Sequence, residues 1–594
     1  MIEIQDITNM PAISGMFLIS IIRKFKKLLN KQQQKKLFFL GLVTCVGAFL
    51  EVIGVSLMMP ITVAILNPDI INTNHIIVSV CSSLDIHSHK DFVLLCIILL
   101  IIVFIVKNLY LLLQYYIQAR FVYDNRLLTQ KQMLHTFLNR PYEFYLSAKS
   151  GEIMRNVNDD VVETYRLLMT LLTFFAETTV ATALIITVFV IAPAMTSLIF
   201  AMMAIIVYVI IKFIKPKLKI KGDELRIHTS LQYKWLLQSV QGIKSIKTAQ
   251  QESFFEKKFY ESSLTRTSSA KWQMVFNHAP KLIIEASCVC ATLSVIAILI
   301  YSGQKMEELV PALATFAMAA VKLMPTANHI VNASNDIAFN GPAIDKLLEN
   351  IPVHKDAEIE HYLGHNCLVI KNNIEVRDIT YSYPNADTKI LDNASFVIPV
   401  GACVGLIGKS GAGKTTTVDI LLGLLKPQTG EIICDGVNVM ENYTGWLANI
   451  GYIPQSIFIL DGTIAENVAF GNEIIDEKIW KALEESQLAD YVRSLPDKAN
   501  TCIGERGIRL SGGQLQRIGI ARALYNDPET IIFDEATSSL DNDTETAIME
   551  SVNHLHGKKT MIIIAHRLHT IEECDFVYEV SNGKIIKSDK YGKK

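Results

Sequence analysis

The stretch ACVGLIGKSGAGKTTTVDILLGLL, residues 402 to 425, decides the fold of the second half of this chain. It predicts a buried strand, a glycine-rich loop and a helix. The loop fits GxxxxGK[ST]: glycines let backbone amides approach phosphate oxygens, Lys414 reaches the outer phosphates, and Thr415 can ligate magnesium. The expected phosphate site comprises Gly408, Lys409, Ser410, Gly411, Ala412, Gly413, Lys414, Thr415 and Thr416.

A second stretch, ETIIFDEATSSLD at residues 529 to 541, predicts a buried strand that ends in two adjacent carboxylates. Such a strand would place Asp534 near magnesium and Glu535 near an attacking water. An acidic helix cap after a core strand would explain either carboxylate alone, but it would not explain their occurrence together with a phosphate loop.

A third stretch, LSGGQLQRIGIARAL at residues 510 to 524, predicts a flexible loop at the N-terminus of an amphipathic helix. Ser511, Gly512 and Gly513 would present amides and a hydroxyl there, which makes an anion site. A second phosphate-binding surface in one domain is redundant unless it serves a nucleotide held elsewhere.

The composition divides the chain into two parts. Half of the 594 residues are hydrophobic, and the apolar runs fall between residues 37 and 330. The 56 Lys and Arg residues nearly balance the 58 Asp and Glu residues, so no overall field favours nucleic acid. The ten cysteines show no zinc spacing, and we expect reduced core residues.

Six segments are long and apolar enough to cross a membrane. The connections at 117–166 and 215–281 and the segment at 21–36 are basic, which predicts that they are cytoplasmic, and an even number of spans returns the second half to the cytoplasm. The patch around 11–22 predicts an interfacial helix that feeds the first span. The expected spans are 37–64, 92–116, 167–191, 195–214, 282–301 and 309–330.

Several ionisable residues fall within or near these spans. Such groups are costly in lipid, so they either face a cavity or pair locally, and the sequence leaves both readings open. They are Glu51, Lys107, Glu177, Lys281, Glu285, Lys322 and His329.

Taken together, the motifs resemble those of an ATP-binding cassette (ABC) exporter half-transporter, with six spans fused to one nucleotide-binding domain. The implied fold class is a polytopic α-helical membrane domain (1–340), a linker (341–372) and an α/β P-loop ABC ATPase domain (373–594). The resembling motifs, in chain order, are the adenine-stacking Tyr383 in YSYP, the Walker A loop Gly408 to Thr416, the Q-loop Gln455 in GYIPQ, the X-loop GERG at Gly504 to Gly507, the signature Leu510 to Gln514, the Walker B pair Asp534 and Glu535, the D-loop Ser538 to Asp541, and the switch His566 in IIIAHR.

The resemblance implies an ATP- and Mg²⁺-dependent ATPase that works as a dimer. The signature of one chain would close over ATP on the Walker A loop of its partner, as a homodimer, with a heterodimer also possible. Glu535 would polarise the attacking water, His566 would contact the terminal phosphate, and Thr415, Gln455 and Asp534 would complete the magnesium shell. Ser511, Gly512, Gly513, Gln514 and Asp541 would contact nucleotide across the dimer.

The resemblance also implies alternating access in the inner (plasma) membrane, with the nucleotide-binding domain in the cytoplasm. The segments 156–163 (NVNDDVVE) and 250–254 resemble the coupling helices that dock onto the cassettes. Dimer closure would then move the spans.

For the substrate, residues 47–68 and 241–259 are similar to bacterial flippases of lipid-linked oligosaccharides. Residues 69–90 would form either a short external helix of that subgroup or an ordinary loop. Lys107, Lys281 and Lys322 could receive a pyrophosphate headgroup. A peptide or bacteriocin exporter, without a leader-cleaving protease domain, is the chief alternative, followed by multidrug or lipid export and by an ATP-gated regulatory or channel-like member.

Overall fold

The computed structural model of the 594-residue chain forms two compact units. The helical unit contains Met1–Arg140 and Ser147–Ile359, and the nucleotide unit contains Pro141–Leu146 and Glu360–Lys594. The structure describes residues 14–56, 88–191, 193–301, 306–351, 370–384, 386, 388–504, 507–534, 555–564 and 571–588. The expected external helix at 69–90 lies almost entirely outside the described residues.

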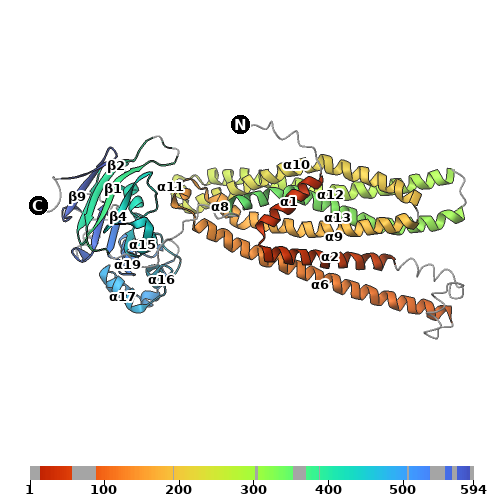
Figure 1. Ribbon diagram of the computed structural model, residues 1–594, viewed down its shortest axis with the longest axis horizontal. Coiled ribbons are helices and arrows are strands. Elements are labelled where there is room, and N and C mark those ends of the chain that lie inside the picture. The colour runs from red at the N-terminus through yellow and green to blue at the C-terminus, as the bar shows by residue number, and fades with distance from the viewer. Residues whose placement is uncertain are drawn as a thin grey trace. The chain divides into compact units, whose positions relative to one another are not determined.

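In the described part of the helical unit, six long helices form a bundle (Figure 1). With 50 residues, α6 is about 75 Å long, whereas a bilayer core is about 30 Å thick. The six helices are α2 (Lys31–Ser56), α6 (His89–Leu138), α9 (Val161–Ile191), α10 (Pro193–Gln241), α12 (Glu252–Tyr301) and α13 (Met306–Asn350). At these lengths α6, α10 and α12 are each more than twice as long as a bilayer core is thick.

Shorter elements complete the helical unit. Helix α1 precedes the first span, and α11 connects α10 to α12. A short helix and one π-helical turn lead into α9. These elements are α1 (Ser14–Leu28), α8 (Ser150–Arg155), η1 (Asn156–Asp160) and α11 (Ile243–Ala249).

The long helices pair along their length, with α10 against α12 and α9 against α13. Large apolar side chains stay exposed on α6, including Leu99, Ile102 and Ile105, which is the surface that lipid would cover. Three described stretches meet the length and hydropathy of a membrane span, namely Lys31–Ile53, Lys90–Leu138 and Ser150–Ile186. Helix α9 ends at Ile191 and α10 begins at Pro193, while Ala192, the first residue of the turn predicted there, lies outside the described residues.

The domain boundary expected at residue 340 falls inside α13, which continues to Asn350. Ala343, Ile344 and Leu347 are buried at helical spacing, so the apolar face that holds α13 in the bundle does not stop at 340. Strand β1 begins at Asn373, where the sequence placed the start of the nucleotide-binding domain.

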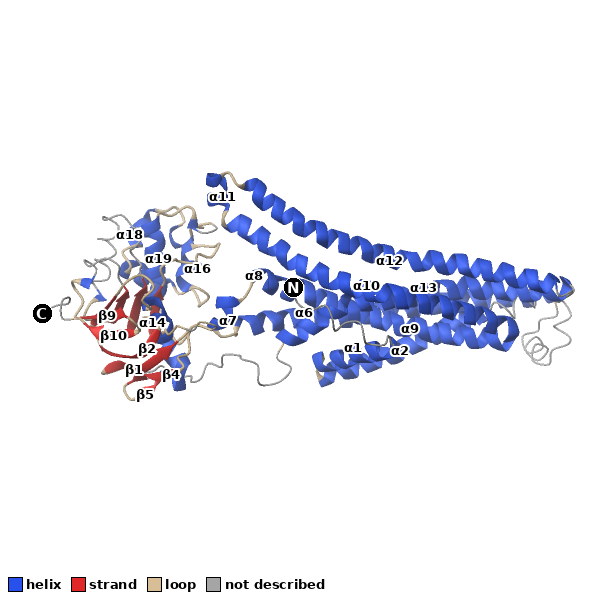
Figure 2. Cartoon of the chain, turned by 90° about the horizontal axis from the view of Figure 1, so that it is seen from above, coloured by secondary structure: helices blue, strands red, loops and turns tan. Residues whose placement is uncertain are grey.

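Two sheets form the nucleotide unit (Figure 2). The antiparallel sheet has the order β2-β1-β4-β5, and the larger sheet has the order β10-β9-β3-β8-β7-β6, parallel except for β10. The strands are β1 (Asn373–Tyr381), β2 (Leu391–Pro399), β3 (Cys403–Ile407), β4 (Thr429–Cys434), β5 (Val437–Asn438), β6 (Ile450–Ile453), β7 (Thr530–Asp534), β8 (Thr560–Ile564), β9 (Phe576–Ser581) and β10 (Lys584–Lys587).

The parallel sheet is buried on both faces. Along β7, Ile531 and Phe533 enter one core cluster while Ile532 enters the other. This alternation is the period of two expected of a strand, and burial on both faces explains why the strand sequence is continuously apolar. The helical domain followed by an α/β ATPase-like domain confirms the predicted fold class.

The helices of the nucleotide unit cover this sheet and fill the connections between strands. The longest are α14, α17 and α19. The helical elements are α7 (Tyr142–Ser147), whose last residue the domain division assigns to the helical unit, α14 (Lys414–Leu421), η2 (Val439–Asn442), α15 (Tyr443–Ala448), α16 (Ile464–Ala469), α17 (Asp476–Glu485), α18 (Ala489–Ser494), η3 (Lys498–Asn500) and α19 (Gly512–Leu524).

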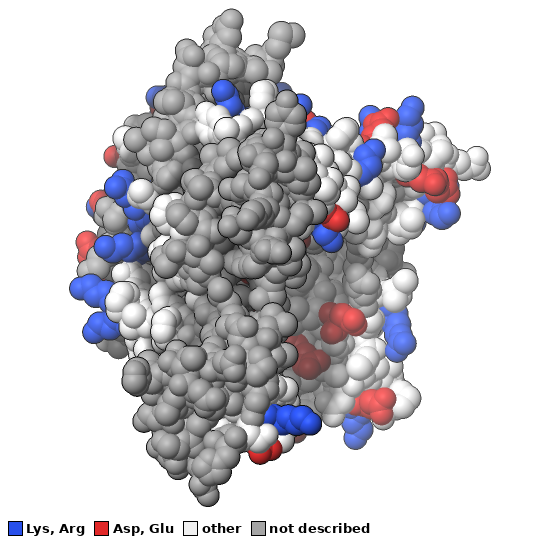
Figure 3. All heavy atoms as spheres, turned by 90° about the vertical axis from the view of Figure 1, so that its right-hand side faces the viewer, with Lys and Arg blue, Asp and Glu red and all other residues white. Residues whose placement is uncertain are grey.

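The described cysteines match the expectation of reduced core residues only in part, since Cys403, Cys434 and Cys574 are buried whereas Cys290 and Cys502 are exposed. Seven described cysteines are free, and no metal-holding His, Cys, Asp and Glu cluster occurs among the described residues. Seen from the right-hand side of Figure 1, basic and acidic side chains both lie around the edge of the face shown in Figure 3.

Candidate functional site

The glycine-rich loop connects the end of β3 to the start of α14. Lys414 is buried, and its Nζ donates to the carbonyl oxygens of Gly408 at 2.9 Å and Lys409 at 3.2 Å. The ammonium group thus holds the loop closed around the space where phosphates would bind. Gly408 has φ +154°, and a Cβ there would lie 2.5 Å from the Val580 carbonyl oxygen. Only glycine fits this position.

Four parallel strands end at the same edge of the sheet and collect the predicted groups there. β3 leads into the phosphate loop, β7 ends at Asp534, and β6 is followed by Gln455. The register pairs Asp534 with Ile564 of β8. Ligands of α/β sheets bind at this carboxyl edge, so the topology brings together groups that are far apart in the sequence.

Asp534 is buried and accepts a hydrogen bond from the Tyr452 hydroxyl at 3.3 Å. Burial and the nearby Asp534 carboxylate raise the pKa of Tyr452, so the phenol stays protonated and donates. Burial and Asp534 also raise the pKa of Asp419, on α14, to about 6. The carboxylates concentrate negative charge at this edge, and a divalent cation would offset it.

Tyr383, the expected adenine-stacking residue, lies beside the phosphate-loop helix. Its hydroxyl and the Thr416 hydroxyl are 3.0 Å apart, and its ring meets the edge of Tyr381 at a centroid distance of 5.3 Å. The Tyr381 hydroxyl in turn donates to Glu143 Oε1 of α7 at 3.4 Å. A chain of contacts therefore joins α7 to the candidate nucleotide site.

The signature segment caps its own helix. The Ser511 hydroxyl accepts from the Gln514 amide at 3.3 Å, and the Gln514 side chain accepts from the Ser511 amide at 2.9 Å. This capping box shapes the start of α19. Ser511 and Gly512 remain exposed at the helix N-terminus, while Gly513 is buried.

The segment that follows β6 is fastened to α19 by two side chains. Gln516 donates to the Gln455 carbonyl oxygen at 3.3 Å, and Arg522 donates to the carbonyl oxygens of Asn467 at 2.9 Å and Phe458 at 2.8 Å. Burial lowers the pKa of Arg522 to about 10. The signature helix and the Q-loop region are thereby held as one piece.

Several predicted residues lie outside the described part of the chain. These are Glu535, Asp541 and His566, together with Glu505 and Arg506 of the GERG loop. Lys409, Ser410, Gly411, Thr415 and Gln455 are exposed, and Ala412 is half-buried. The described phosphate loop, Gln455 and Asp534 thus lie at one edge of the sheet, with accessible groups.

The predicted coupling segment 156–163 belongs to the helical unit. It forms η1 and the start of α9 in the helical unit, where Asp160 is 1% exposed and bonded to two arginines. The structure assigns Pro141–Leu146 to the nucleotide unit. Its aromatic run YEFY directly after a proline was the signal that sequence reasoning missed. Gln250 caps α11, and Phe254 lies in α12.

The suggested phosphate-binding group of Lys107, Lys281 and Lys322 stays a prediction. Lys107 is buried, Lys281 is exposed, and the Lys322 side chain lies outside the described residues. Glu285 is exposed as well. The structure brings Glu177 within 4.0 Å of His329 and into electrostatic range of Glu51.

Sequence reasoning also missed Tyr381, Asp419, Tyr452, Gln516 and Arg522. All five stand within the quoted stretches, but no motif gives them a role, because each acts through a partner that is close only after folding. Tyr452 and Asp534, for example, meet because β6 and β7 are neighbours in the sheet.

Comparisons with known proteins match both units. The model of the family described as ABC transporter matches residues 391–538, and that of the ABC transporter transmembrane region matches 37–321. An ATP-dependent lipid A-core flippase of Photobacterium profundum is 34% identical over 313 residues, which cover 51% of this chain and 52% of the relative. ABC transporter B family member 6 of Dictyostelium discoideum is 40% identical over 222 residues, covering 36% and 33%.

The chain thus spans between a third and about half of these relatives' own length. A solved structure of a bacterial Atm1-family ABC exporter with ATP bound shares the fold, with a TM-score of 0.74 at 20% identity, covering 94% of this chain and 95% of that one. Both regions of the family are therefore present in the order that the sequence predicted. The chain belongs to the ABC transporters, as a half-transporter of the exporter type with one transmembrane region and one ABC domain.

Proposed function

We propose that this protein is an ATP-driven exporter that flips an amphipathic substrate, a lipid-linked oligosaccharide or related lipid, across the inner membrane. One observation carries the proposal: a closed phosphate loop and a buried Asp534 lie at one sheet edge of a domain fused to helices long enough to cross a bilayer and continue beyond it. The domain division 1–340, 341–372 and 373–594 belongs to the same proposal.

The proposed chemistry is hydrolysis of ATP by an in-line water. Amides of the loop and Lys414 would bind the phosphates, and Tyr383 would stack on adenine. Glu535 would polarise the water, and His566 would contact the terminal phosphate. Positioning and electrostatic stabilisation then supply the rate acceleration, because little covalent chemistry is required of the protein.

The residues present fit a magnesium ion. Thr415 is exposed in the first turn of α14, Gln455 is exposed after β6, and the buried Asp534 ends β7, so oxygen donors come from three neighbouring elements. When bound, the ion would supply charge neutralisation to the phosphates. Tyr452 would keep the Asp534 carboxylate oriented.

A homodimer completes the proposed site, with a heterodimer as the alternative. Ser511 and Gly512 are exposed at the N-terminus of α19, a 13-residue helix, where free amides and the helix dipole favour a phosphate. Gly513, Gln514 and Asp541 would complete this surface. The phosphate loop of the same chain already has its own amides, so the signature would serve the partner's nucleotide. Within this proposal, α11 stays the candidate for docking onto a nucleotide-binding domain.

The lipid substrate is supported by the relatives named as lipid A-core flippases. One observation favours the alternative, a peptide exporter: the Glu51, Glu177 and His329 cluster would accept a cationic group more readily than a pyrophosphate. The lipid and the peptide substrate thus differ in the charge that the spans must accommodate, which is negative for a pyrophosphate and positive for a cationic peptide.

ATPase activity of the full chain in lipid nanodiscs tests the proposal. We expect wild type to hydrolyse ATP, Glu535→Gln to be inactive, and Glu529→Gln, an exposed carboxylate at the start of the same segment, to be active. A polyprenyl-pyrophosphate glycan should raise turnover. Stimulation by a cationic peptide but not by the glycan would replace the lipid by the peptide, and equal activity of Glu535→Gln and wild type would refute the catalytic assignment.

A further inference from the structure

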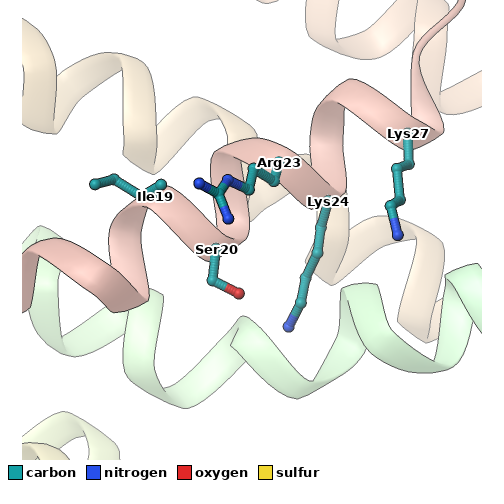
Figure 4. A pocket seen from close by; sticks show the side chains of 5 residues that line it. All are labelled: Ile19, Ser20, Arg23, Lys24 and Lys27. Atoms are coloured by element: carbon teal, nitrogen blue, oxygen red, sulfur yellow. The ribbon is translucent and has the colours of Figure 1, made fainter.

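Helix α1 carries a pocket that the proposed transport cycle does not use. Figure 4 shows the five residues that line it, with Ser20, Lys24 and Lys27 extending to the same side of the helix. Positions 20, 24 and 27 share a helix face because they are separated by four and three residues. The full lining is Ile19, Ser20, Arg23, Lys24 and Lys27.

Two buried side chains and one ion pair hold α1 against the helical unit. Ile21 and Phe25 are 0% and 2% exposed, and α1 contacts α13. Lys24 Nζ forms an ion pair with Asp345 Oδ1 of α13 at 2.6 Å. The lining residues are therefore presented from a held helix rather than from a free terminus.

The pocket has more positive charge than its surroundings neutralise. Lys24 has its carboxylate, whereas Arg23 and Lys27 are exposed, and no ion pair joins either of them to an acidic residue in the described ranges. An arginine fork beside an ammonium group and a serine hydroxyl suits a phosphate, because charge-assisted hydrogen bonds to its oxygens are strong.

The position of α1 directly before a membrane span indicates that this phosphate belongs to a lipid. Only two residues separate Leu28 from α2, whose apolar stretch Lys31–Ile53 can cross a membrane. Beside the cations, Ile19 and Ile22 are 50% and 53% exposed. Exposed apolar and basic side chains on one helix next to a span are typical of the membrane interface.

We propose that this pocket binds the headgroup phosphate of an anionic phospholipid of the bilayer in which the protein sits. Arg23 and Lys27 hold the phosphate, Ser20 donates a hydroxyl, and Ile19 contacts the start of the acyl chains. The lipid is a bound component of the protein and is distinct from the substrate proposed above.

Native mass spectrometry of the purified full chain, titrated with phosphatidylglycerol or phosphatidylcholine, tests the site. We expect tighter binding of phosphatidylglycerol and a loss on the order of tenfold in Arg23→Gln/Lys27→Gln, since both charge-assisted contacts to the phosphate are removed. Lys26→Gln/Lys36→Gln removes the same charge from exposed positions outside the pocket and should change binding by less than about twofold.

Three results would overturn the proposal: equal losses in both double variants, equal affinity for phosphatidylcholine, or displacement of the lipid by millimolar inorganic phosphate. Thermal melting of each variant checks folding. The single variants Arg23→Gln and Lys27→Gln should each show a smaller loss, which keeps the test decisive if the double variant is unstable.

Discussion

The two units of this protein arrange their polar groups in opposite ways. In the nucleotide unit the functional groups gather at one edge of a parallel sheet, where strand register places them. In the helical unit buried polar groups pair between helices that are far apart in sequence. Short sequence motifs therefore suffice to predict functional groups where strand ends meet at one edge of a sheet. Pairings between distant helices leave no local sequence pattern.

The clearest pairing in the helical unit surrounds Asp160. Its carboxylate accepts from Arg155 Nε at 3.1 Å and from Arg226 Nε at 2.9 Å. Arg155 also donates to the Ser230 hydroxyl at 2.8 Å, and Arg226 donates to the Pro342 carbonyl oxygen at 3.0 Å. One buried carboxylate thus fastens the π-helical turn, α10 and α13 together.

The largest effect should come from the nucleotide unit. Lys414→Ala removes the cation that closes the phosphate loop, and we expect ATPase activity to fall about 10²- to 10³-fold, as when one preorganised donor is lost. Lys426→Ala, an exposed lysine beyond α14, should keep its activity. Activity of Lys414→Ala near the wild-type level would mean that this loop does not bind the reacting phosphates.

In the helical unit, we expect a substitution in the buried ion-pair network to lower the free energy of unfolding. Asp160→Asn leaves two arginines with an uncompensated buried charge, and we expect a loss of about 3 kcal/mol in the free energy of unfolding, measured by thermal or denaturant melting in detergent. Asp124→Asn breaks the exposed pair with Arg120 and should cost less than about 1 kcal/mol. Equal losses would mean that the Asp160 network contributes no more than a surface pair.

The features that could be predicted from the sequence also differ between the nucleotide unit and the helical unit. The phosphate loop, Asp534 and the signature could be found because each needs a fixed spacing of residue types within one turn or strand end. The six long helices could be found because a bilayer demands about 20 apolar residues. The continuations of these helices beyond their apolar stretches carry no comparable demand, and the boundary predicted at residue 340 falls inside α13, which ends at Asn350.

The rest could not be predicted because it depends on distant partners. The role of Tyr452 exists only because β6 lies beside β7, and Asp160 reads as an exposed acid in NVNDDVVE although it is buried. The lysines of the spans were grouped by charge alone, whereas the structure groups Glu177 with His329. Spacing predicts what is local, and only the fold decides which distant groups meet.

A smaller effect in the nucleotide unit is the pH dependence of stability that Asp419 causes. The pKa of Asp419 rises from 3.8 to about 6 on folding, so the unfolded carboxyl ionises first and the stability of wild type falls as the pH rises from about 4 to about 6. Asp419→Asn removes this loss, and its melting temperature should exceed that of wild type by about 2 °C at pH 7.5 and by less at pH 5. Asp497→Asn, exposed in the same unit, should show no such trend. A pH-independent gain would assign the effect to packing rather than to ionisation.

The smallest effect concerns the contact chain from α7 to the nucleotide site. Tyr381→Phe keeps the ring that meets Tyr383 but loses the hydroxyl that donates to Glu143, a bond worth about 1 kcal/mol. If this bond transmits motion, substrate stimulation of ATPase activity should fall about two- to fivefold while basal activity is kept, and Glu143→Gln, which retains an acceptor oxygen, should fall less. Tyr443→Phe removes a buried hydroxyl that donates to the Leu422 carbonyl oxygen and serves as the control. If basal and stimulated activity fall together in Tyr381→Phe, the hydroxyl supports the fold of β1 and does not couple α7 to the nucleotide site. The contrast between local motifs in the nucleotide unit and distant pairings in the helical unit would then have no exception in the nucleotide unit.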